Sequence, residues 1–301
     1  MTANHNHSPL RAGARHRRPL VVAFCLVVAF MFVEIIAGFM TGSLALLSDA
    51  GHMATDALGL GMALAAITAA NRAQRTTLHT YGLYRLEILA AMANAILLFG
   101  VAVYVLIEAA RRLDQPPEVL GGPMLAVAVV GLVVNLISWR LLRAGSTESI
   151  NVEGAYLEVL ADMIGSVGVI VAALLIRFTG WAHADPLFAA GIGVFILPRA
   201  WRLGRRSLRI LLQAAPEGID IEAMNHRLLT IDGVTGIHDL HVWTLTSEMD
   251  VATLHMVTRE GTDPHPILDD ARLLLQDEYG ITHATLQVEP DTHSGCSEVS
   301  W

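Results

Sequence analysis

The chain has 301 residues, and its hydrophobic fraction of 53% comes with only 16% charged residues, against about 25% in an ordinary soluble domain. Its apolar residues lie in long blocks before about residue 212, which predicts a membrane domain followed by a soluble domain. The net charge of −8 is unevenly distributed, with acidic residues dominating the C-terminal part and arginines the edges of the membrane part. This pattern excludes a nucleic-acid partner, and two cysteines, Cys25 and Cys296, exclude a disulfide framework.

The N-terminal part is polar and then becomes strongly apolar. Residues 1–18 are expected to form a disordered tail, followed by a membrane domain over 19–212. Six apolar stretches within it reach the spanning length of about 20 residues, at 19–41, 44–70, 86–110, 122–144, 152–177 and 186–208. The first could be a signal peptide, but its apolar run is too long and five more follow, so we expect a retained helix.

Arginine placement predicts the orientation of these helices. The N-terminus, the 71–85 loop, the 140–151 loop and the end of the sixth stretch hold fourteen arginines, whereas the opposite loops hold three, Arg111, Arg112 and Arg177. Positive residues concentrate on the cytoplasmic side. Both termini are therefore expected in the cytoplasm, as an even number of spans requires.

The second stretch, "SLALLSDAGHMATDALGL", places ionisable groups where lipid is expected. His52 and Asp56 are four residues apart and share one helix face, with Asp49 three residues before His52 on the same side. The fifth stretch repeats the spacing with Glu158 and Asp162 in "AYLEVLADMIGS". If the two helices face each other, the two pairs surround one ion.

These acidic residues need a compensating charge, since each costs about 2.5–3.5 kcal/mol at mid-bilayer when unpaired. We find no matching set of cations in the spans, and one imidazole with three carboxylates suits four-coordinate Zn²⁺. Two alternatives remain open. The groups could line a watery cavity, or they could serve an intramembrane metallopeptidase, although no HExxH-like motif is present. Asp49 lies about two turns from Asp56 and is a candidate pathway residue.

The C-terminal part, 213–290, alternates between helical and strand patterns in the order α-β-β-α-β, with a tail over 291–301. Its segments are "IDIEAMNHRLLTIDG", "VTGIHDLHVWTLTS", "DVATLHMVT", "PHPILDDARLLLQDEYG" and "ITHATLQVE". This order predicts a small α+β domain with its helices on one face of a sheet.

Five segments together resemble the cation diffusion facilitator family of metal/proton antiporters. They are "SLALLSDAGHMATD", "YGLYRLEILAAMANA", "GAYLEVLADMIGSVGVI", "HADPLFAAGIG" and "HDLHVWTLTS". The resemblance implies a homodimeric transporter, not an enzyme, with six transmembrane helices and a cytoplasmic ferredoxin-like domain. It implies a transport site of His52, Asp56, Glu158 and Asp162. The short loop between the fourth and fifth spans has no histidine, which is typical of bacterial members and implies the bacterial inner (plasma) membrane.

Glu158 stands where many zinc-transporting members of that family have histidine, which makes the site harder and more anionic. Zn²⁺ is the expected substrate, with Co²⁺ and Cd²⁺ next and Fe²⁺ or Mn²⁺ as further alternatives. Histidine binds metal in its neutral form, so protons would compete for His52 and serve as the coupling ion. A membrane metal sensor that moves no ions would use the same ligands and remains an alternative.

The resemblance also implies regulatory metal sites in the C-terminal domain. By position, their ligands would be His238, His255, His265 and Glu289, while Gln287 stands where some members have histidine.

Overall fold

The computed structural model describes residues 17–72, 81–144, 150–246 and 249–292. The expected N-terminal tail therefore lies almost entirely outside the described residues, as do residues 293–301 of the C-terminal tail. The chain forms two compact units, one of residues 1–61 and 93–202 and the other of residues 62–92 and 203–301. Each is described separately.

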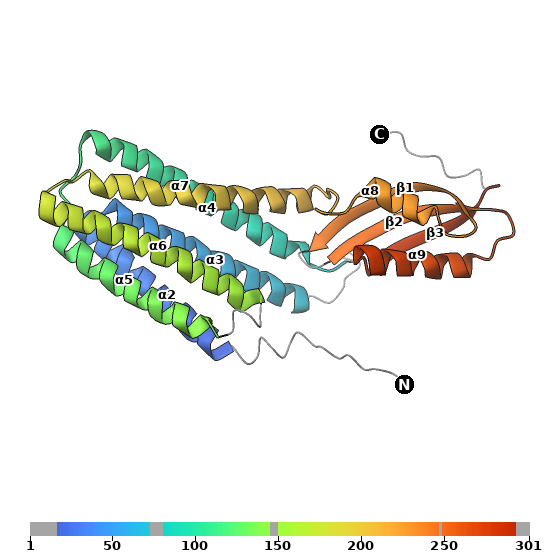
Figure 1. The fold of residues 1–301 in the computed structure, drawn as a ribbon, viewed down its shortest axis with the longest axis horizontal. Helices are drawn as coiled ribbons and strands as arrows, with labels where there is room; N and C mark the ends of the chain where they lie inside the picture. The colour runs from blue at the N-terminus through green and yellow to red at the C-terminus, as the bar shows by residue number, and fades with distance from the viewer. Residues whose placement is uncertain (1–16, 73–80, 145–149, 247–248, 293–301) are drawn as a thin grey trace. The chain divides into compact units, whose positions relative to one another are not determined.

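The helices of the predicted membrane domain begin and end close to the expected residues. They are α2 (Arg17–Thr41), α3 (Leu44–Arg72), α4 (Arg85–Asp114), α5 (Gly121–Leu142), α6 (Ile150–Thr179) and α7 (Ala184–Leu211) (Figure 1). Five of them are long and apolar enough to cross a membrane. The sixth, α3, has 29 residues, but polar side chains interrupt its apolar run.

Close packing of small side chains holds the first unit together. Helix α5 lies between α2 and α6 (Figure 1), and α4 contacts α7 through Leu98, Ala102, Ile196 and Ala200. The largest core cluster is rich in alanine, which lets helix backbones approach closely, as is common in membranes; its alanines are Ala37, Ala45, Ala109, Ala128, Ala172, Ala173, Ala184 and Ala189.

Large apolar side chains cover the outside of these helices. Phe39, Met40, Tyr104 and Phe195 are each more than half exposed. Exposure of this kind on long helices is what a hydrocarbon solvent requires. The chain therefore has a multi-pass helical membrane domain.

The second unit contains a three-stranded sheet with two short helices. The helices are α8 (Ile221–Leu228) and α9 (Pro264–Tyr279), and the strands are β1 (Val234–Thr246), β2 (Met249–Thr258) and β3 (His283–Pro290). The strand order is β1-β2-β3, with β1 antiparallel and β3 parallel to β2. This confirms the predicted α-β-β-α-β domain.

The ends of the two short helices follow from their sequence. The Asp220 side chain accepts a 3.1 Å hydrogen bond from the Ala223 backbone N–H at the start of α8. Proline at the start of α9 and Gly280, with φ of 70°, at its end mark the boundaries of that helix. Both helices pack on one face of the sheet, through Met224, Leu228, Ile267, Ala271 and Leu275, onto Val242, Ala252, Leu254 and Met256.

Candidate metal centres

The ligand pairs predicted in the second and fifth stretches come together in the first unit. Nε2 of His52 on α3 lies 3.7 Å from Oε1 of Glu158 and 3.8 Å from Oδ1 of Asp162, both on α6. One ligand atom from each of the three residues fits within 4.8 Å of the others. A single metal ion between the helices would contact all three.

Asp56 approaches the same histidine from its other side. Its Oδ2 lies 3.5 Å from Nδ1 of His52, one helical turn away on α3. In this arrangement three groups converge on one point and the fourth lies beside them. A carboxylate on the second ring nitrogen is a common way to orient a metal-binding histidine. Asp56 is not among the three converging residues, and its role as a fourth ligand stays a prediction.

Burial differs across the site. The side chains of His52 and Asp162 are 7% and 4% exposed, whereas those of Asp56 and Glu158 are 20% and 26% exposed. Nδ1 of His52 and Oδ1 of Asp162 have no hydrogen-bond partner among the described residues. Buried polar atoms without partners are costly, and a bound divalent ion would satisfy the carboxylates of this group.

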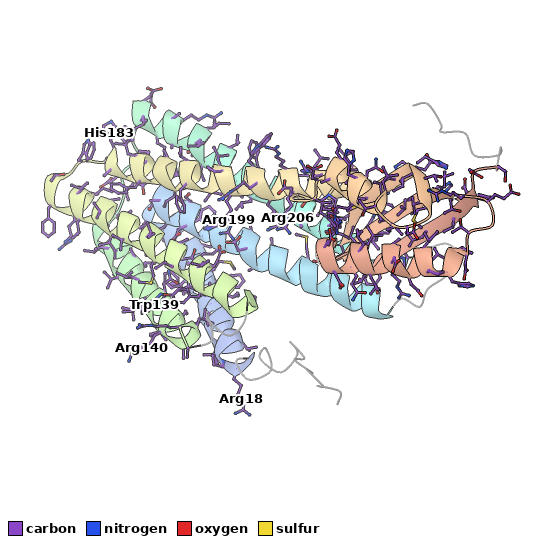
Figure 2. The ribbon with its side chains drawn as sticks, turned by 45° about the vertical axis from the view of Figure 1, so that its right-hand side comes forward. Arg18, Trp139, Arg140, His183, Arg199 and Arg206 are labelled. Atoms are coloured by element: carbon purple, nitrogen blue, oxygen red, sulfur yellow. The ribbon has the colours of Figure 1, made fainter. Side chains whose placement is uncertain are left out.

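Arg199 on α7 adds a positive charge to this group of acidic residues. The sequence analysis counted it among the arginines at the end of the sixth apolar stretch. Arg199, in the middle of α7 (Figure 2), donates from both terminal nitrogens to the two carboxylate oxygens of Glu158. Its Nη2 lies 3.8 Å from Oδ1 of Asp56. The sequence analysis found no matching set of cations in the spans, and the structure shows that a single arginine, Arg199, reaches these acids. Its place inside the sixth apolar stretch, beside Pro198, was the available signal.

The candidate pathway residue Asp49 is 2% exposed and lies deeper in the helix packing. Its Oδ1 lies 3.0 Å from the point where a Cβ on Gly165 of α6 would stand. It interacts with Glu34 of α2, which is 1% exposed. The structure thus places Asp49 in a second buried acidic pair, apart from the three converging ligands.

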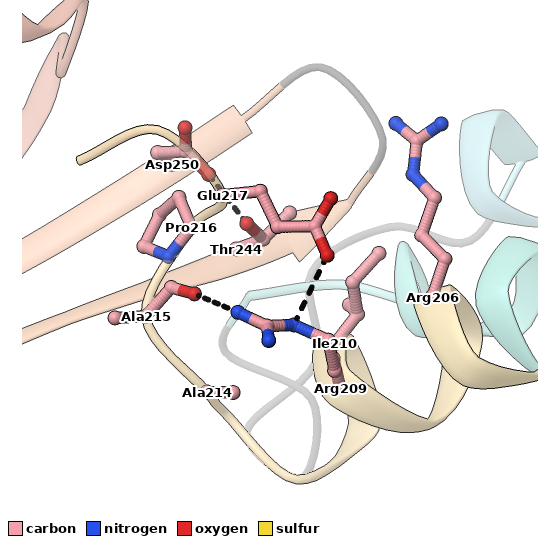
Figure 3. Close-up of a pocket in the computed structure, with 9 residues that line it drawn as sticks. All are labelled: Arg206, Arg209, Ile210, Ala214, Ala215, Pro216, Glu217, Thr244 and Asp250. Atoms are coloured by element: carbon pink, nitrogen blue, oxygen red, sulfur yellow. Dashed lines mark hydrogen bonds and ion pairs between the residues drawn. The ribbon is translucent and has the colours of Figure 1, made fainter.

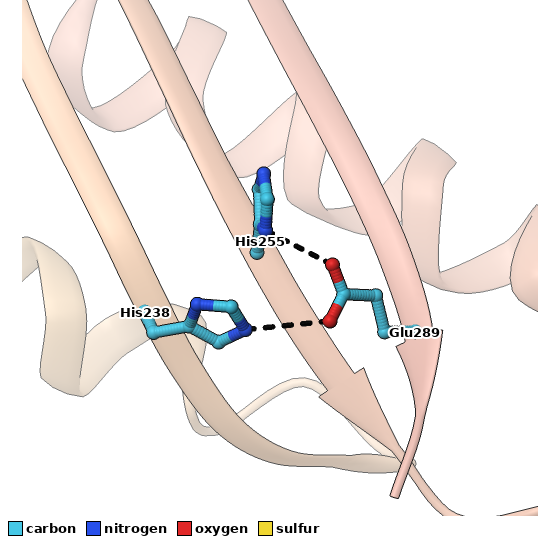
Figure 4. Close-up of side chains that lie close together, drawn as sticks. All are labelled: His238, His255 and Glu289. Atoms are coloured by element: carbon cyan, nitrogen blue, oxygen red, sulfur yellow. Dashed lines mark ion pairs between the residues drawn. The ribbon is translucent and has the colours of Figure 1, made fainter. Parts of the chain in front are cut away.

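Three of the four residues expected to form a C-terminal site also come together (Figure 4). Nδ1 of His255 on β2 lies 2.9 Å from Oε1 of Glu289 on β3, and Nε2 of His238 on β1 lies 3.4 Å from Oε2 of the same carboxylate. The two imidazole rings meet edge to face with centroids 4.9 Å apart. Two imidazoles and one carboxylate form a suitable set for Zn²⁺ with a fourth position open.

Strand register explains this convergence. His238 pairs with His255, and Gln287 pairs with His255 from the other side, so their side chains share the sheet face that the helices leave uncovered. The Gln287 amide donates a 2.7 Å hydrogen bond to Oε1 of Glu289 and orients it. His265 is not part of the group, because it lies exposed at the start of α9, which packs on the opposite face.

A cavity of about 230 Å³ lies at the end of α7 (Figure 3). Arg209 lines this cavity, and its Nη2 donates a 3.0 Å hydrogen bond to the Ala215 carbonyl. Its Nε lies 3.5 Å from Oε1 of Glu217. The Thr244 hydroxyl donates a 2.6 Å hydrogen bond to Asp250. Arg209, Glu217, Thr244 and Asp250 thus pair with neighbouring groups, and none of the clusters of metal-ligating side chains among the described residues lies in this cavity.

Comparison with known proteins identifies the family. The model of the cation efflux transmembrane domain matches residues 20–212, and that of the cation efflux protein cytoplasmic domain matches residues 216–291. The chain belongs to the cation efflux family. This confirms the resemblance to cation diffusion facilitators and shows a transporter rather than an enzyme.

Curated relatives match over nearly their whole length. The metal cation efflux system protein CzcD of Cupriavidus metallidurans is 46% identical over 290 residues, covering 96% of this chain and 90% of the relative. The cadmium, cobalt and zinc/H(+)-K(+) antiporter of Bacillus subtilis is 38% identical over 297 residues, covering 96% and 93%. The zinc transporter ZitB of Escherichia coli is 41% identical over 302 residues, covering 97% and 96%.

Among solved structures, one of the metal-bound C-terminal domain of the CzcD transporter from Cuprividus metallidurans is 35% identical to this chain. It covers 24% of this chain and 99% of that structure, with a TM-score of 0.23.

Proposed function

We propose that the protein exports Zn²⁺ from the cytoplasm in exchange for protons, with His52, Asp56, Glu158 and Asp162 holding the ion in transit. The observation that carries this proposal is the convergence of His52, Glu158 and Asp162 from two helices of the membrane domain, within 4.8 Å of one another. The strongly buried His52 and Asp162 make this a site shielded from solvent. Ionisable groups inside a membrane domain mark ion pathways.

Zinc is the proposed substrate because two of the relatives, the Bacillus subtilis antiporter and the Escherichia coli transporter, carry zinc in their names, and because the donor set suits it. Cobalt and cadmium appear in the name of the Bacillus subtilis relative, and we propose them as further substrates of the same site. A third carboxylate in place of a second imidazole favours harder ions more than a two-histidine site would. Because of this third carboxylate, Fe²⁺ and Mn²⁺ are included as alternative substrates in the flux test below.

Protons are the proposed coupling ion because metal ligands act in their deprotonated forms. Protons and metal therefore compete for His52 and for the carboxylates around it. A site that binds metal on one side of the membrane and protons on the other performs an exchange of the two. The name of the Bacillus subtilis relative, an antiporter, supports this coupling.

We further propose a homodimer in the bacterial inner membrane with both termini in the cytoplasm. The arginine distribution supports the orientation. His238, His255 and Glu289 are the proposed ligands of a second metal ion, one that regulates the transporter and is not transported, since they lie at the surface of a sheet and not between membrane helices.

The test is ion flux in vesicles that contain only the purified protein. We expect Zn²⁺ uptake that requires a pH gradient, collapses when a protonophore dissipates it, and is absent from protein-free vesicles. Parallel measurements with Co²⁺, Cd²⁺, Fe²⁺ and Mn²⁺ rank the substrates. Saturable Zn²⁺ binding without flux of any of the five ions would contradict the proposal and establish a membrane metal sensor instead.

A further inference from the structure

Arg199 and Glu158 form a two-pronged ion pair inside the candidate transport site. The two terminal nitrogens of the guanidinium donate to Oε1 and Oε2 of Glu158, so both oxygens of this carboxylate are occupied. This fork-to-fork geometry is the strongest way in which arginine binds a carboxylate. The pair joins α7 to α6 at the level of the metal ligands.

The same oxygen atom also faces the metal position. Oε1 of Glu158 lies 3.7 Å from Nε2 of His52 and accepts from Arg199 Nη1. A guanidinium has no acceptor atom and keeps its proton in proteins, so it cannot itself become a metal ligand. The metal ion and the guanidinium would therefore approach the same oxygen of Glu158 and repel each other, so the contact between Arg199 and Glu158 is expected to weaken when an ion binds.

Charge balance gives Arg199 a second effect. Asp56, Glu158 and Asp162 carry three negative charges when they bind metal, and the imidazole of His52 is neutral. Arg199, with Nη2 3.8 Å from Oδ1 of Asp56, offsets one of these three charges in the empty site. A divalent ion is therefore attracted by two net negative charges instead of three, which weakens its binding.

We propose that Arg199 is a positioning residue of the transport site, which holds the Glu158 carboxylate while the site is empty and yields it to the metal ion on binding. Its positive charge then repels the bound ion and weakens the binding, which favours release on the far side of the membrane. This inference rests on the proposed function, because it concerns the same site.

A purely structural role is the competing explanation. In that case Arg199 only ties α7 to α6, and its removal would loosen Glu158 and weaken metal binding. The two explanations predict opposite changes in affinity. If Arg199 repels the bound ion, its removal must tighten metal binding, whereas a purely structural role predicts weaker binding.

The first experiment measures Zn²⁺ affinity of the purified full chain by competition with a chelating dye. His238→Ala and His255→Ala are present throughout, so that the C-terminal group does not contribute. Arg199→Gln is expected to bind Zn²⁺ tighter by on the order of tenfold, since a unit charge a few ångströms from a divalent ion contributes at least that much at a protein-like dielectric. Unchanged or weaker binding would overturn the inference.

Arg202→Gln is the matched control. Arg202 lies three residues further along α7, is exposed, and donates only to the Pro198 carbonyl at 3.4 Å in the described contacts. Its replacement should leave Zn²⁺ affinity at the wild-type value. A tenfold change in this control as well would show that any loss of positive charge from α7 matters, which contradicts a specific role for Arg199.

Transport kinetics supply a readout that a structural role would not move in this way. In vesicles, Arg199→Gln should lower KM and kcat together, because the ion binds more tightly and leaves more slowly. If Arg199→Gln does not accumulate as folded protein, Arg199→Lys is measured in its place. Lysine keeps the positive charge but cannot make the two parallel hydrogen bonds to Glu158. This variant should bind Zn²⁺ within about threefold of wild type, and a tenfold change in either direction would overturn the charge argument.

The design separates this inference from the proposed function. If the wild-type membrane site, freed of the C-terminal group, binds no Zn²⁺ beyond what His52→Ala binds, both fail. If the wild type binds Zn²⁺ and loses it with His52→Ala but Arg199→Gln changes nothing, the role of Arg199 alone is wrong.

Discussion

The carboxylate of Asp185, in the first turn of α7, accepts a 2.7 Å hydrogen bond from the backbone N–H of Leu44, the first residue of α3. It also accepts from the Ala45 N–H at 3.1 Å and from the Ser43 hydroxyl at 2.6 Å. Asp185 is completely buried. One helix thus caps another, and the negative charge favours the positive end of the α3 dipole. This fixes the start of the helix that carries His52.

Asp185→Ala should destabilise the membrane domain by about 2–4 kcal/mol, because it removes a cap and several charge-assisted hydrogen bonds at a buried position. Thermal unfolding of the purified protein in detergent would show a lower melting temperature. Asp114→Ala, at the exposed end of α4, is the control and should melt like the wild type. Equal melting of the Asp185 variant would mean that the start of α3 is held by other contacts.

Glu158→His should change metal preference without abolishing transport. Imidazole is a softer ligand than carboxylate, so we expect Zn²⁺ to gain over Mn²⁺ by about tenfold in the ratio of vesicle uptake rates. The substitution also frees Arg199 from its ion pair. Glu118→His, at an exposed position in the connection between α4 and α5, should keep the wild-type ratio. A wild-type ratio in the Glu158 variant would exclude Glu158 from the ligands.

The C-terminal group should bind one metal ion of its own. Metal content of the full chain after dialysis against Zn²⁺ should fall by about one ion per protomer in a His238→Ala, His255→Ala double variant, since two of its three ligands are lost. His241→Ala is the matched control on the same strand, where His241 is exposed and pairs with Thr253. Undiminished zinc in the double variant would leave this cluster without a metal-binding role.

The candidate transmembrane ligands could be paired from the sequence because the pairing within each helix depends only on helix geometry. Spacing by four residues puts His52 with Asp56 and Glu158 with Asp162 on single faces, whatever the rest of the chain does. Arg199 could not be predicted in the same way. Its long side chain reaches across from a third helix, and counting arginines at membrane edges assigned it to the flank of the sixth span.

The C-terminal group shows a different limit. Strict alternation along a strand would place His238 and His241 on opposite faces, but β1 has an irregularity in register between them, next to Asp239 with φ of 51°. Such a bulge shifts the side-chain faces by one residue and has no sequence signal here. The assignment of His265 as a ligand rested on its position in the family alone. In the structure His265 lies on α9, which packs on the face of the sheet opposite to His238, His255 and Glu289.

The most direct test of the account compares two histidines in one flux assay. His52 lies among the carboxylates of α3 and α6, whereas His183 stands at the start of α7, far along that helix from Arg199 (Figure 2). In vesicles with a pH gradient, His52→Ala should lose Zn²⁺ uptake while His183→Ala retains it, at equal amounts of folded protein. Wild-type uptake by the His52 variant would contradict the assignment of the transport site.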